Sequence, residues 1–304
     1  MTTTDVTFPL APRRRFAGLP FGSMNSVRRG SGSDIAGSRP YRPGDDARAI
    51  DWNASARLSS AHGADEFIVR EYIAEEAPRV VLLCDRRPAM ALFPRPLPWL
   101  AKPEAMRQAA DLISDATLAA RGFLGYLDHA GDDQATWVAP RSQHELPEAA
   151  RNESFGAPED NLTRAFDFLA RLHPPLPGGT FIFVCSDFLA PISEETWVFT
   201  FERGWDVVPV VIQDPLWERS FPDVSGVVVP LYDQGRRRFV AVRLTRREAA
   251  RRREENEARA EELLSGLRAL DLGPVLVTTT DREQIFQAFL QWADERIISR
   301  GRWW

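Results

Sequence analysis

The sequence is poor in several residue types and motifs, and each shortage argues against a class of protein. There are two cysteines in 304 residues, Cys84 and Cys185, and both lie in apolar runs. We expect buried, reduced thiols, because free cysteine is among the most buried residue types. The four histidines are scattered without ligand spacing. No Gly-x-Ser-x-Gly, glycine-rich phosphate loop or Cys-x-x-Cys occurs, so the common hydrolase, nucleotide and thiol-redox sites are disfavoured.

Long apolar runs and lysine are also scarce. No segment approaches the roughly 18–20 apolar residues of a membrane span. Residues 1–10 lack the charged-then-apolar pattern of a signal peptide, so we expect a cytoplasmic protein. The net charge of −5 gives no general attraction to nucleic acid or anionic lipid. Lys102 is the only lysine among 38 basic residues, a bias that we attribute to genome composition.

The 44% of apolar residues that are present alternate between strand-like and helix-like patterns from residue 79 onward. Strands are expected at 79–84, 123–127, 135–138, 180–186, 206–212 and 274–279, with a further one at 67–69. Helices are expected at 103–121, 162–172, 193–203 and 245–270 and from 280 onward, the last two opened by capping boxes at Thr245 and Thr280. A hairpin is expected within 224–244. This alternation predicts an α/β fold with a doubly wound, mostly parallel sheet.

Two of the expected strands are followed directly by an acid. The run 79–84 ends before Asp85, and the run 180–186 ends before Asp187. Open α/β sheets place their ligand sites at the carboxyl ends of the strands. The two aspartates are therefore candidate site residues.

Residues 26–78 form a charged extension in front of this domain, which we assign to residues 79–300. Opposite charges and aromatic rings are interleaved around a Pro-Gly turn at Arg39, Tyr41, Arg42, Asp45, Asp46, Asp51, Trp52 and Arg57. Exposed ion pairs stabilise a protein by only about 0–1 kcal/mol each. We therefore expect this motif to be partly buried or to contact another chain, as a salt-bridged brace or as a docking surface.

Residues 1–25 are expected to form a flexible basic arm. Seven arginines and one acid lie between Arg13 and Arg42. A solvated leader is the simpler interpretation, and peripheral docking on an acidic partner or a lipid surface is the alternative. Nucleic-acid binding through this arm is a second alternative function, which would fall steeply with salt.

The motifs together resemble a known bacterial family. The pattern Gly30-x-Gly32-x-Asp34, the run from Arg39 to Arg57, Arg70-Glu71, the strand ending at Asp85, and Ser186-Asp187-Phe188 are similar to the family DUF58, over roughly residues 25–300. The resemblance implies a fold similar to a von Willebrand factor A domain. It also implies a MoxR-type AAA+ ATPase as partner and partner binding rather than turnover. Many members look membrane-anchored through an N-terminal hairpin, which this sequence lacks.

The same resemblance implies a metal site that has been altered. Metal-binding von Willebrand A domains use Asp-x-Ser-x-Ser, a threonine and a second aspartate, which suit Mg²⁺ or Mn²⁺. Here Asp85 and Asp187 match the two acids, Arg87 and Ala89 replace the serines, and the threonine position falls on Asp160. We predict no metal and no cofactor, with Arg87 as an internal cation in the vacated space. Arg86 would take that place if the loop turned differently.

The leading interpretation is a non-enzymatic interaction module, an adaptor or client-recognition factor for the ATPase. Its candidate binding residues are Asp85, Arg87, Asp160 and Asp187, with no catalytic residue. A metal-dependent hydrolase that uses Asp85 and Asp187 is the first alternative, since such an enzyme needs convergent acids and an open metal position.

Overall fold

The computed structural model describes residues 7–13, 35–41, 47, 50–62, 67–72, 77–92, 99–129, 134–141, 148–151, 154–233 and 238–301. By its internal contacts the chain divides into two compact units. The smaller is Phe16–Ala77, and the larger comprises Met1–Arg15 and Pro78–Trp304. The motif residues Arg42, Asp45 and Asp46 lie outside the described residues, as do Gly30, Gly32 and Asp34.

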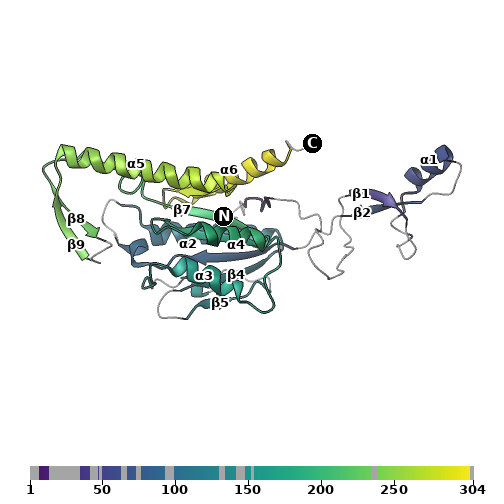
Figure 1. The fold of residues 1–304 in the computed structure, drawn as a ribbon, viewed down its shortest axis with the longest axis horizontal. Coiled ribbons are helices and arrows are strands. Elements are labelled where there is room, and N and C mark those ends of the chain that lie inside the picture. Colours follow the sequence, from purple (N-terminus) through teal and green to yellow (C-terminus); the bar gives the residue numbers. More distant parts are fainter. Residues whose placement is uncertain are drawn as a thin grey trace, which may run out of the picture. The chain divides into compact units, whose positions relative to one another are not determined.

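The larger unit is built on a six-stranded sheet (Figure 1). In spatial order its strands are β10 (Val275–Val277), β7 (Asp206–Ile212), β6 (Phe181–Ser186), β3 (Arg79–Cys84), β4 (Phe123–Asp128) and β5 (Thr136–Val138). All neighbours are parallel except β4 and β5. Counted from β3, the order is 3-2-1-4-5-6, that of a doubly wound sheet, which confirms the expected α/β class.

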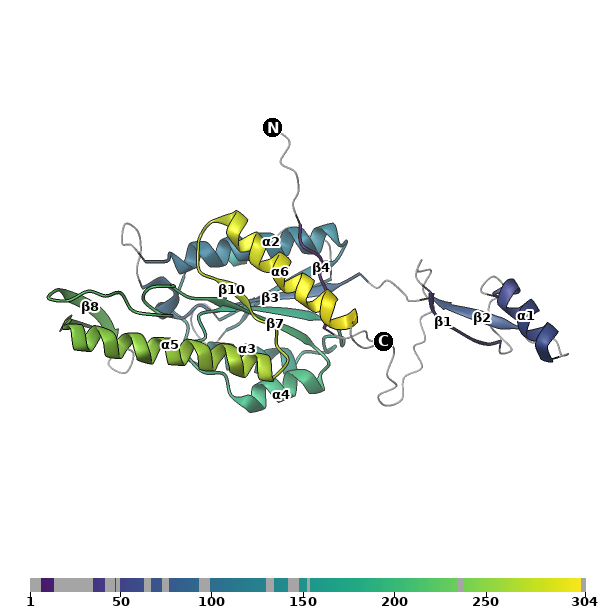
Figure 2. The same cartoon turned by 90° about the horizontal axis from the view of Figure 1, so that it is seen from above.

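Helices cover both faces of this sheet. They are α2 (Lys102–Ala119), α3 (Asn161–Ala170), α4 (Glu194–Glu202), α5 (Arg246–Ala269) and α6 (Arg282–Gly301), with short 3-10 turns η2 (Pro88–Ala91) and η3 (Glu148–Arg151). Figure 2 shows α2 and α6 on one side and α3, α4 and α5 on the other. No helix in the described ranges combines the length and apolarity needed to span a bilayer.

The central strands are buried on both faces, which explains their continuous apolar runs. Along β3, Val80 and Leu82 belong to the core under α2 and α6, while Val81 and Leu83 belong to the core under α3 and α4. Cys84 and its neighbour in register on β6, Cys185, are buried free thiols, as expected.

The predicted hairpin forms before α5. Strands β8 (Val228–Asp233) and β9 (Arg238–Arg243) pair antiparallel at the amino end of α5 (Figure 1). Thr245 caps α5, because its side chain accepts a hydrogen bond from the backbone N–H of Glu248. A small core of Phe221, Leu244 and Ala249 joins the hairpin to the helix.

The expected cap of α6 is one residue off. The side chain of Asp281, not that of Thr280, accepts the hydrogen bond from the third residue of the helix, Gln284 N, at 2.9 Å. A carboxylate interacts better than a hydroxyl with the positive end of the helix dipole. Charge therefore favours Asp281 over the adjacent Thr280 as the cap.

The expectation of a flexible arm over residues 1–25 is wrong for residues 7–13, which pack on the larger unit. Phe8 is 2% exposed and stacks on Phe289 of α6, with ring centroids 4.6 Å apart. Asp206, at the start of β7, accepts a bond from Arg13 N at 2.6 Å. Arg296 of α6 donates to Ala11 O at 3.1 Å. The ring of Phe8 and the hydrogen bonds of two backbone groups, Arg13 N and Ala11 O, hold residues 7–13 in place. The basic composition of this segment does not predict these contacts.

The smaller unit contains β1 (Ile35–Pro40), α1 (Trp52–His62) and β2 (Ile68–Tyr72), and β1 pairs antiparallel with β2. The sequence predicted only the second strand. Glycine, serine and proline in β1 hide a strand pattern. Apolar periodicity is weak in α1, which begins because the Asp51 side chain accepts a bond from Ala54 N at 3.0 Å.

Candidate functional site at the carboxyl edge of the sheet

Two aspartates stand where the two central strands end. Asp85 follows β3 and Asp187 follows β6, and both side chains are 0% exposed. The two strands are parallel neighbours with Cys84 opposite Cys185, so the aspartates meet at one place on the sheet edge. The strand order reverses between β3 and β6, which is where open α/β sheets form their ligand crevices.

The guanidinium of Arg87 lies between the two carboxylates. Its Nε donates to Oδ1 and Oδ2 of Asp85 at 3.1 and 2.9 Å, and its Nη2 donates to Asp85 Oδ2 at 2.6 Å. Nη2 also donates to Oδ1 of Asp187 at 2.5 Å. Nη1 donates to Oε2 of Glu159 at 3.3 Å, and the Glu159 side chain is 51% exposed. The planar fork of donors matches carboxylates from three different loops.

Lys102, at the start of α2, supplies a second buried cation. Its Nζ donates to Oδ2 of Asp187 at 2.8 Å and to Oε1 of Glu218 at 2.6 Å. The other oxygen of Glu218 accepts a bond from Asp214 N at 2.8 Å. Asp187 thus receives Arg87 on one oxygen and Lys102 on the other. The strand-end cluster, as we call Asp85, Arg87, Lys102, Asp187 and Glu218, contains three carboxylates and two cations.

Asn161, rather than Asp160, completes this cluster. The side-chain amide of Asn161, 1% exposed, donates to Asp85 Oδ1 at 3.1 Å. Ser186 Oγ donates to Asp85 Oδ2 at 2.6 Å. The Asp160 carboxylate pairs with Arg164 at 2.9 Å on the surface, so the structure does not bring it together with Asp85, Arg87 and Asp187. A buried carboxylate needs donors, which an amide offers and a second carboxylate does not.

Burial and the cluster's own charges act against each other on the pKa values of Arg87, Lys102, Asp187 and Glu218. Burial lowers the pKa of Arg87, but Asp187 and Asp85 outweigh it, so this pKa lies above its ordinary value. Burial also lowers the pKa of Lys102, but Asp187 and Glu218 outweigh burial, so this pKa is raised as well. Burial raises the pKa of Asp187, yet Lys102 and Arg87 bring it below its ordinary value. For Glu218, burial prevails over Lys102 and its pKa is raised.

These residues do not fit the metal that the fold resemblance implies. Both oxygens of Asp85 and both oxygens of Asp187 already accept hydrogen bonds. The Arg87 guanidinium fills the space between them and cannot lose its proton to become a ligand. Within the described ranges, no group of three or more His, Cys, Asp or Glu side chains could hold a metal ion.

Arg86 points to a different partner. Its Nε donates to Asp128 Oδ2 at 3.2 Å and its Nη2 to the hydroxyl of Tyr126 at 2.8 Å, both on β4. Burial works against its charge, but Cys84, Tyr126 and Asp128 raise the pKa of Arg86. Of the two adjacent arginines, Arg87 therefore enters the strand-end cluster and Arg86 does not.

The motif of the smaller unit presents an aromatic cluster at its surface. Tyr41, Trp52 and Phe67 are 38%, 63% and 42% exposed. Phe67 meets both other rings edge to face, at 6.4 Å from Tyr41 and 6.0 Å from Trp52. Arg57 is exposed on α1, and Arg39 lies in β1. We call Tyr41, Trp52 and Phe67 the aromatic trio.

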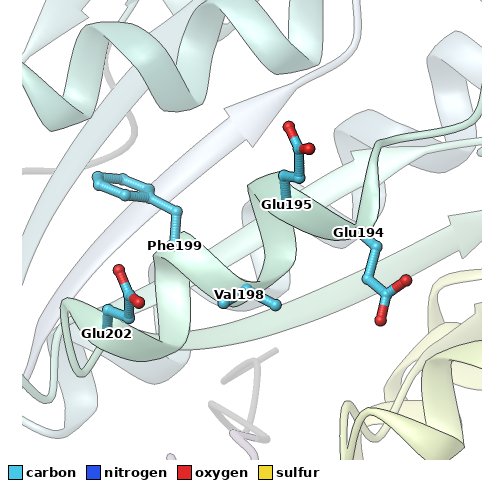
Figure 3. A pocket seen from close by; sticks show the side chains of 5 residues that line it. All are labelled: Glu194, Glu195, Val198, Phe199 and Glu202. Carbon is cyan, nitrogen blue, oxygen red and sulfur yellow. The ribbon is translucent and has the colours of Figure 1, made fainter.

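A second surface feature lies on α4 of the larger unit. A shallow cavity of about 310 Å³ is lined by Glu194, Glu195, Val198, Phe199 and Glu202 (Figure 3). Its Glu194 and Glu195 belong to the first turn of α4, where acids favour the helix dipole. Helix stability therefore accounts for these charges without a ligand.

Sequence reasoning missed Lys102 and Glu218 in the cluster, Asn161 that donates to its Asp85, and Phe67 in the aromatic trio. One signal was present in the composition. Lys102 is the single lysine, and all the remaining basic residues are arginines. Lysine and arginine are not interchangeable, because a compact ammonium and a planar fork of donors make different contacts. Glu218 gave no local signal, because it reaches Lys102 across 116 residues of sequence.

Comparisons with known proteins identify the family of this chain. Residues 37–263 match the family described as "Protein of unknown function DUF58", and the chain belongs to this family. It is 26% identical over 235 residues to the uncharacterized proteins Rv1480 of Mycobacterium tuberculosis and Mb1516 of Mycobacterium bovis. Those alignments cover 75% of this chain and 70% of each relative.

Two solved structures are similar at low sequence identity. One is the conserved hypothetical protein BatB from Bacteroides thetaiotaomicron, with a TM-score of 0.38, 15% identity and coverage of 71% of this chain and 99% of that one. The other is an aerotolerance-related membrane protein from Bacteroides fragilis, with a TM-score of 0.39, 13% identity and coverage of 72% and 99%.

Proposed function

We propose that the protein is a non-enzymatic protein-interaction module. The observation that carries the proposal is the state of the strand-end cluster, whose carboxylates are bound to Arg87 and Lys102. Acid–base catalysis needs a group that can take up and release a proton in reach of substrate. Asp187, held as an anion between Arg87 and Lys102, is a poor proton carrier, and it braces loops well. A hydrolase built on Asp85 and Asp187 would first have to expel Arg87.

The aromatic trio is the docking surface in this proposal. Tryptophan and tyrosine are enriched among the few residues that dominate interface energies. Three adjacent exposed rings on a small unit expose apolar area that a partner could cover, whereas isolated exposed rings need no such explanation. Trp52 is the most exposed of the three, so it has the most area to lose on binding.

The partner in this proposal is a MoxR-type AAA+ ATPase. Family context supports it, since members of the family are often encoded beside such ATPases. The protein would serve in the cytoplasm as an adaptor or client-recognition factor, with the smaller unit docking and the larger unit presenting a rigid sheet edge.

Binding of the full chain to the purified MoxR-type ATPase of the same organism tests this proposal by biolayer interferometry. We expect saturable binding, weakened at least tenfold by Trp52→Ala. Leu216→Ala is the matched control, because Leu216 is 56% exposed but lies on the larger unit. It should leave affinity within twofold. Absence of binding, or equal losses in both variants, would contradict the proposal.

A further inference from the structure

We propose that the hairpin of β8 and β9, together with the start of α5, is a docking surface for an acidic segment of a protein partner. The basic hairpin surface, as we call it, consists of Val228, Pro230, Ala241, Arg243, Arg246 and Arg247. It lies at one end of the larger unit (Figure 1). This surface shares no residue with the strand-end cluster or the aromatic trio, and the inference does not depend on the ATPase as partner.

One face of the hairpin is apolar and exposed. In the antiparallel register Val228 lies opposite Arg243, and Pro230 lies opposite Ala241. Residues opposite one another, and those two positions further along each strand, share a face of a hairpin. All four residues are exposed, Val228 at 62%. Val242, which points to the other face, packs against the small core that joins the hairpin to α5. The core thus covers one face and leaves the other to solvent.

Three arginines at this face have no acidic partner. Among the residues that the structure describes, no hydrogen bond or ion pair involves the guanidinium groups of Arg243, Arg246 or Arg247, and all three residues are exposed. The pattern changes one turn further along α5, where Arg251 pairs with Glu248 at 2.9 Å. The first three guanidinium groups therefore present their charge and their donors to solvent.

Helix stability does not explain these charges. Arg246 and Arg247 are the first two residues of α5, a helix of 24 residues. This end of a helix carries the positive end of the dipole, where carboxylates stabilise the helix and cations destabilise it. The first turn of α4 follows that rule with Glu194 and Glu195. The two arginines instead cost α5 some stability, and a bound carboxylate would offset that cost.

A short acidic segment fits this surface better than an extended polyanion. The planar fork of arginine donors matches carboxylates, and protein interfaces usually place apolar residues at the centre and charges at the rim. The chain has a net charge of −5 even with these arginines counted. A membrane or a nucleic acid extends past the hairpin and meets that negative charge, whereas a short segment covers the hairpin alone. The segment should carry aspartate or glutamate between apolar residues.

The test measures, by fluorescence polarisation, binding of the full chain to a labelled peptide with five Glu-Glu-Val repeats. The same peptide with Gln in place of Glu is the charge control. The hairpin variant carries Arg243→Gln, Arg246→Gln and Arg247→Gln. The matched control variant loses the same charge from exposed arginines elsewhere on the larger unit, by Arg141→Gln, Arg171→Gln and Arg268→Gln. Val228→Ser tests the apolar part of the surface, and circular dichroism checks that each variant is folded.

We expect wild type to bind the glutamate peptide saturably, with a dissociation constant below about 1 mM that rises between about 50 and 200 mM NaCl. The hairpin variant should bind roughly five- to tenfold more weakly, which corresponds to three lost exposed ion pairs. Val228→Ser should weaken binding roughly twofold or more. The control variant should stay within about twofold of wild type, because its charges lie away from the hairpin.

Equal affinity for the glutamine peptide, or equal losses in the two triple variants, would overturn the proposal. The peptide and salt comparisons use wild type alone, so they decide the question even if a variant does not fold. Vesicles with phosphatidylserine and an oligothymidine are tested in parallel, and tighter binding of either one through the same arginines would overturn the choice of partner. Trp52→Ala, which tests the proposed function, should leave affinity for the glutamate peptide unchanged, so the two proposals can fail independently.

Discussion

Replacing Arg87 with methionine is expected to destabilise the larger unit by about 3–5 kcal/mol. Methionine keeps much of the apolar stem but removes the guanidinium that Asp85 and Asp187 share. Both carboxylates are fully buried. They then remain as neighbouring anions in a site closed to water, which is the costly way to break a buried ion pair.

The structure explains why the loss should be smaller than the sum of the lost hydrogen bonds. Arg87 makes four N–H to carboxylate contacts with Asp85 and Asp187, at 2.5 to 3.1 Å. At roughly 1.5–3 kcal/mol each, their simple sum would exceed the prediction. The sum does not apply, because Ser186 and Lys102 keep donating to the two carboxylates and water can enter beside Glu159. Proton uptake by one carboxylate relieves the remainder.

Arg282→Met is the matched control. Arg282 pairs with Asp115 at 2.7 Å, and the side chains are 46% and 47% exposed. We expect a loss of about 0–1 kcal/mol there. Urea unfolding followed by near-ultraviolet circular dichroism measures both variants. For a unit of this size the Arg87 variant should also unfold roughly 6–20 °C lower.

The pH dependence separates charge from packing. In wild type, the cations hold the pKa of Asp187 below its ordinary value, so this stabilisation is present at neutral pH and is lost as pH falls through the folded pKa. Without Arg87 the pKa of Asp187 should rise, because one of the two cations that lower it is gone, so acidification toward about pH 4 stabilises the variant relative to wild type. A loss that matches the Arg282 control, or one that does not shrink between pH 7 and 4, would refute the reasoning.

Further variants test the choice between Asn161 and Asp160, the packing of Phe8 and the burial of His129. Asn161→Ala should lower the free energy of unfolding by about 1–3 kcal/mol, because its hydrogen bond to Asp85 is lost. Asp160→Ala should lower it by less than about 1 kcal/mol. Equal losses in urea unfolding would mean that Asp160 contributes to the site as much as Asn161 does. Phe8→Ala should lower the free energy of unfolding by about 3–5 kcal/mol, and a change under 1 kcal/mol would mean that residues 7–13 do not stay packed. Burial lowers the pKa of His129, so the free energy of unfolding of the wild type should fall as pH drops through about 6.5. His129→Gln should remove this pH dependence. Urea unfolding at pH 7 and 5.5 measures both proteins.

Much of the larger unit could be predicted from the sequence because its signals are local. A strand buried on both faces reads as an unbroken apolar run, as at 79–84, and a cap such as Thr245 acts on a residue three positions away. The placement of Asp85 and Asp187 at one edge also follows from local signals, once parallel pairing of the two runs is assumed.

The rest depends on contacts between distant residues, which no local pattern encodes. Glu218 reaches Lys102 across 116 positions, and Phe8 packs on a helix near the opposite end of the chain. The choice between Asp160 and Asn161 depends on which side chain faces Asp85, and a register error of one residue reverses it. In the smaller unit, α1 and β1 lack the apolar periodicity on which the prediction relies.

A buried ion cluster is weak evidence for stability, because apolar side chains of similar volume often serve as well. Apolar side chains do not form directional hydrogen bonds that fix the positions of the loops. Arg87 ties the loops after β3 and β6 to Glu159, and Lys102 ties the start of α2 to Glu218, each through bonds of defined geometry. A dissociable ion would make that edge depend on the concentration of the ion. Covalently attached cations hold it in one arrangement at all metal concentrations, which agrees with the interaction module proposed above.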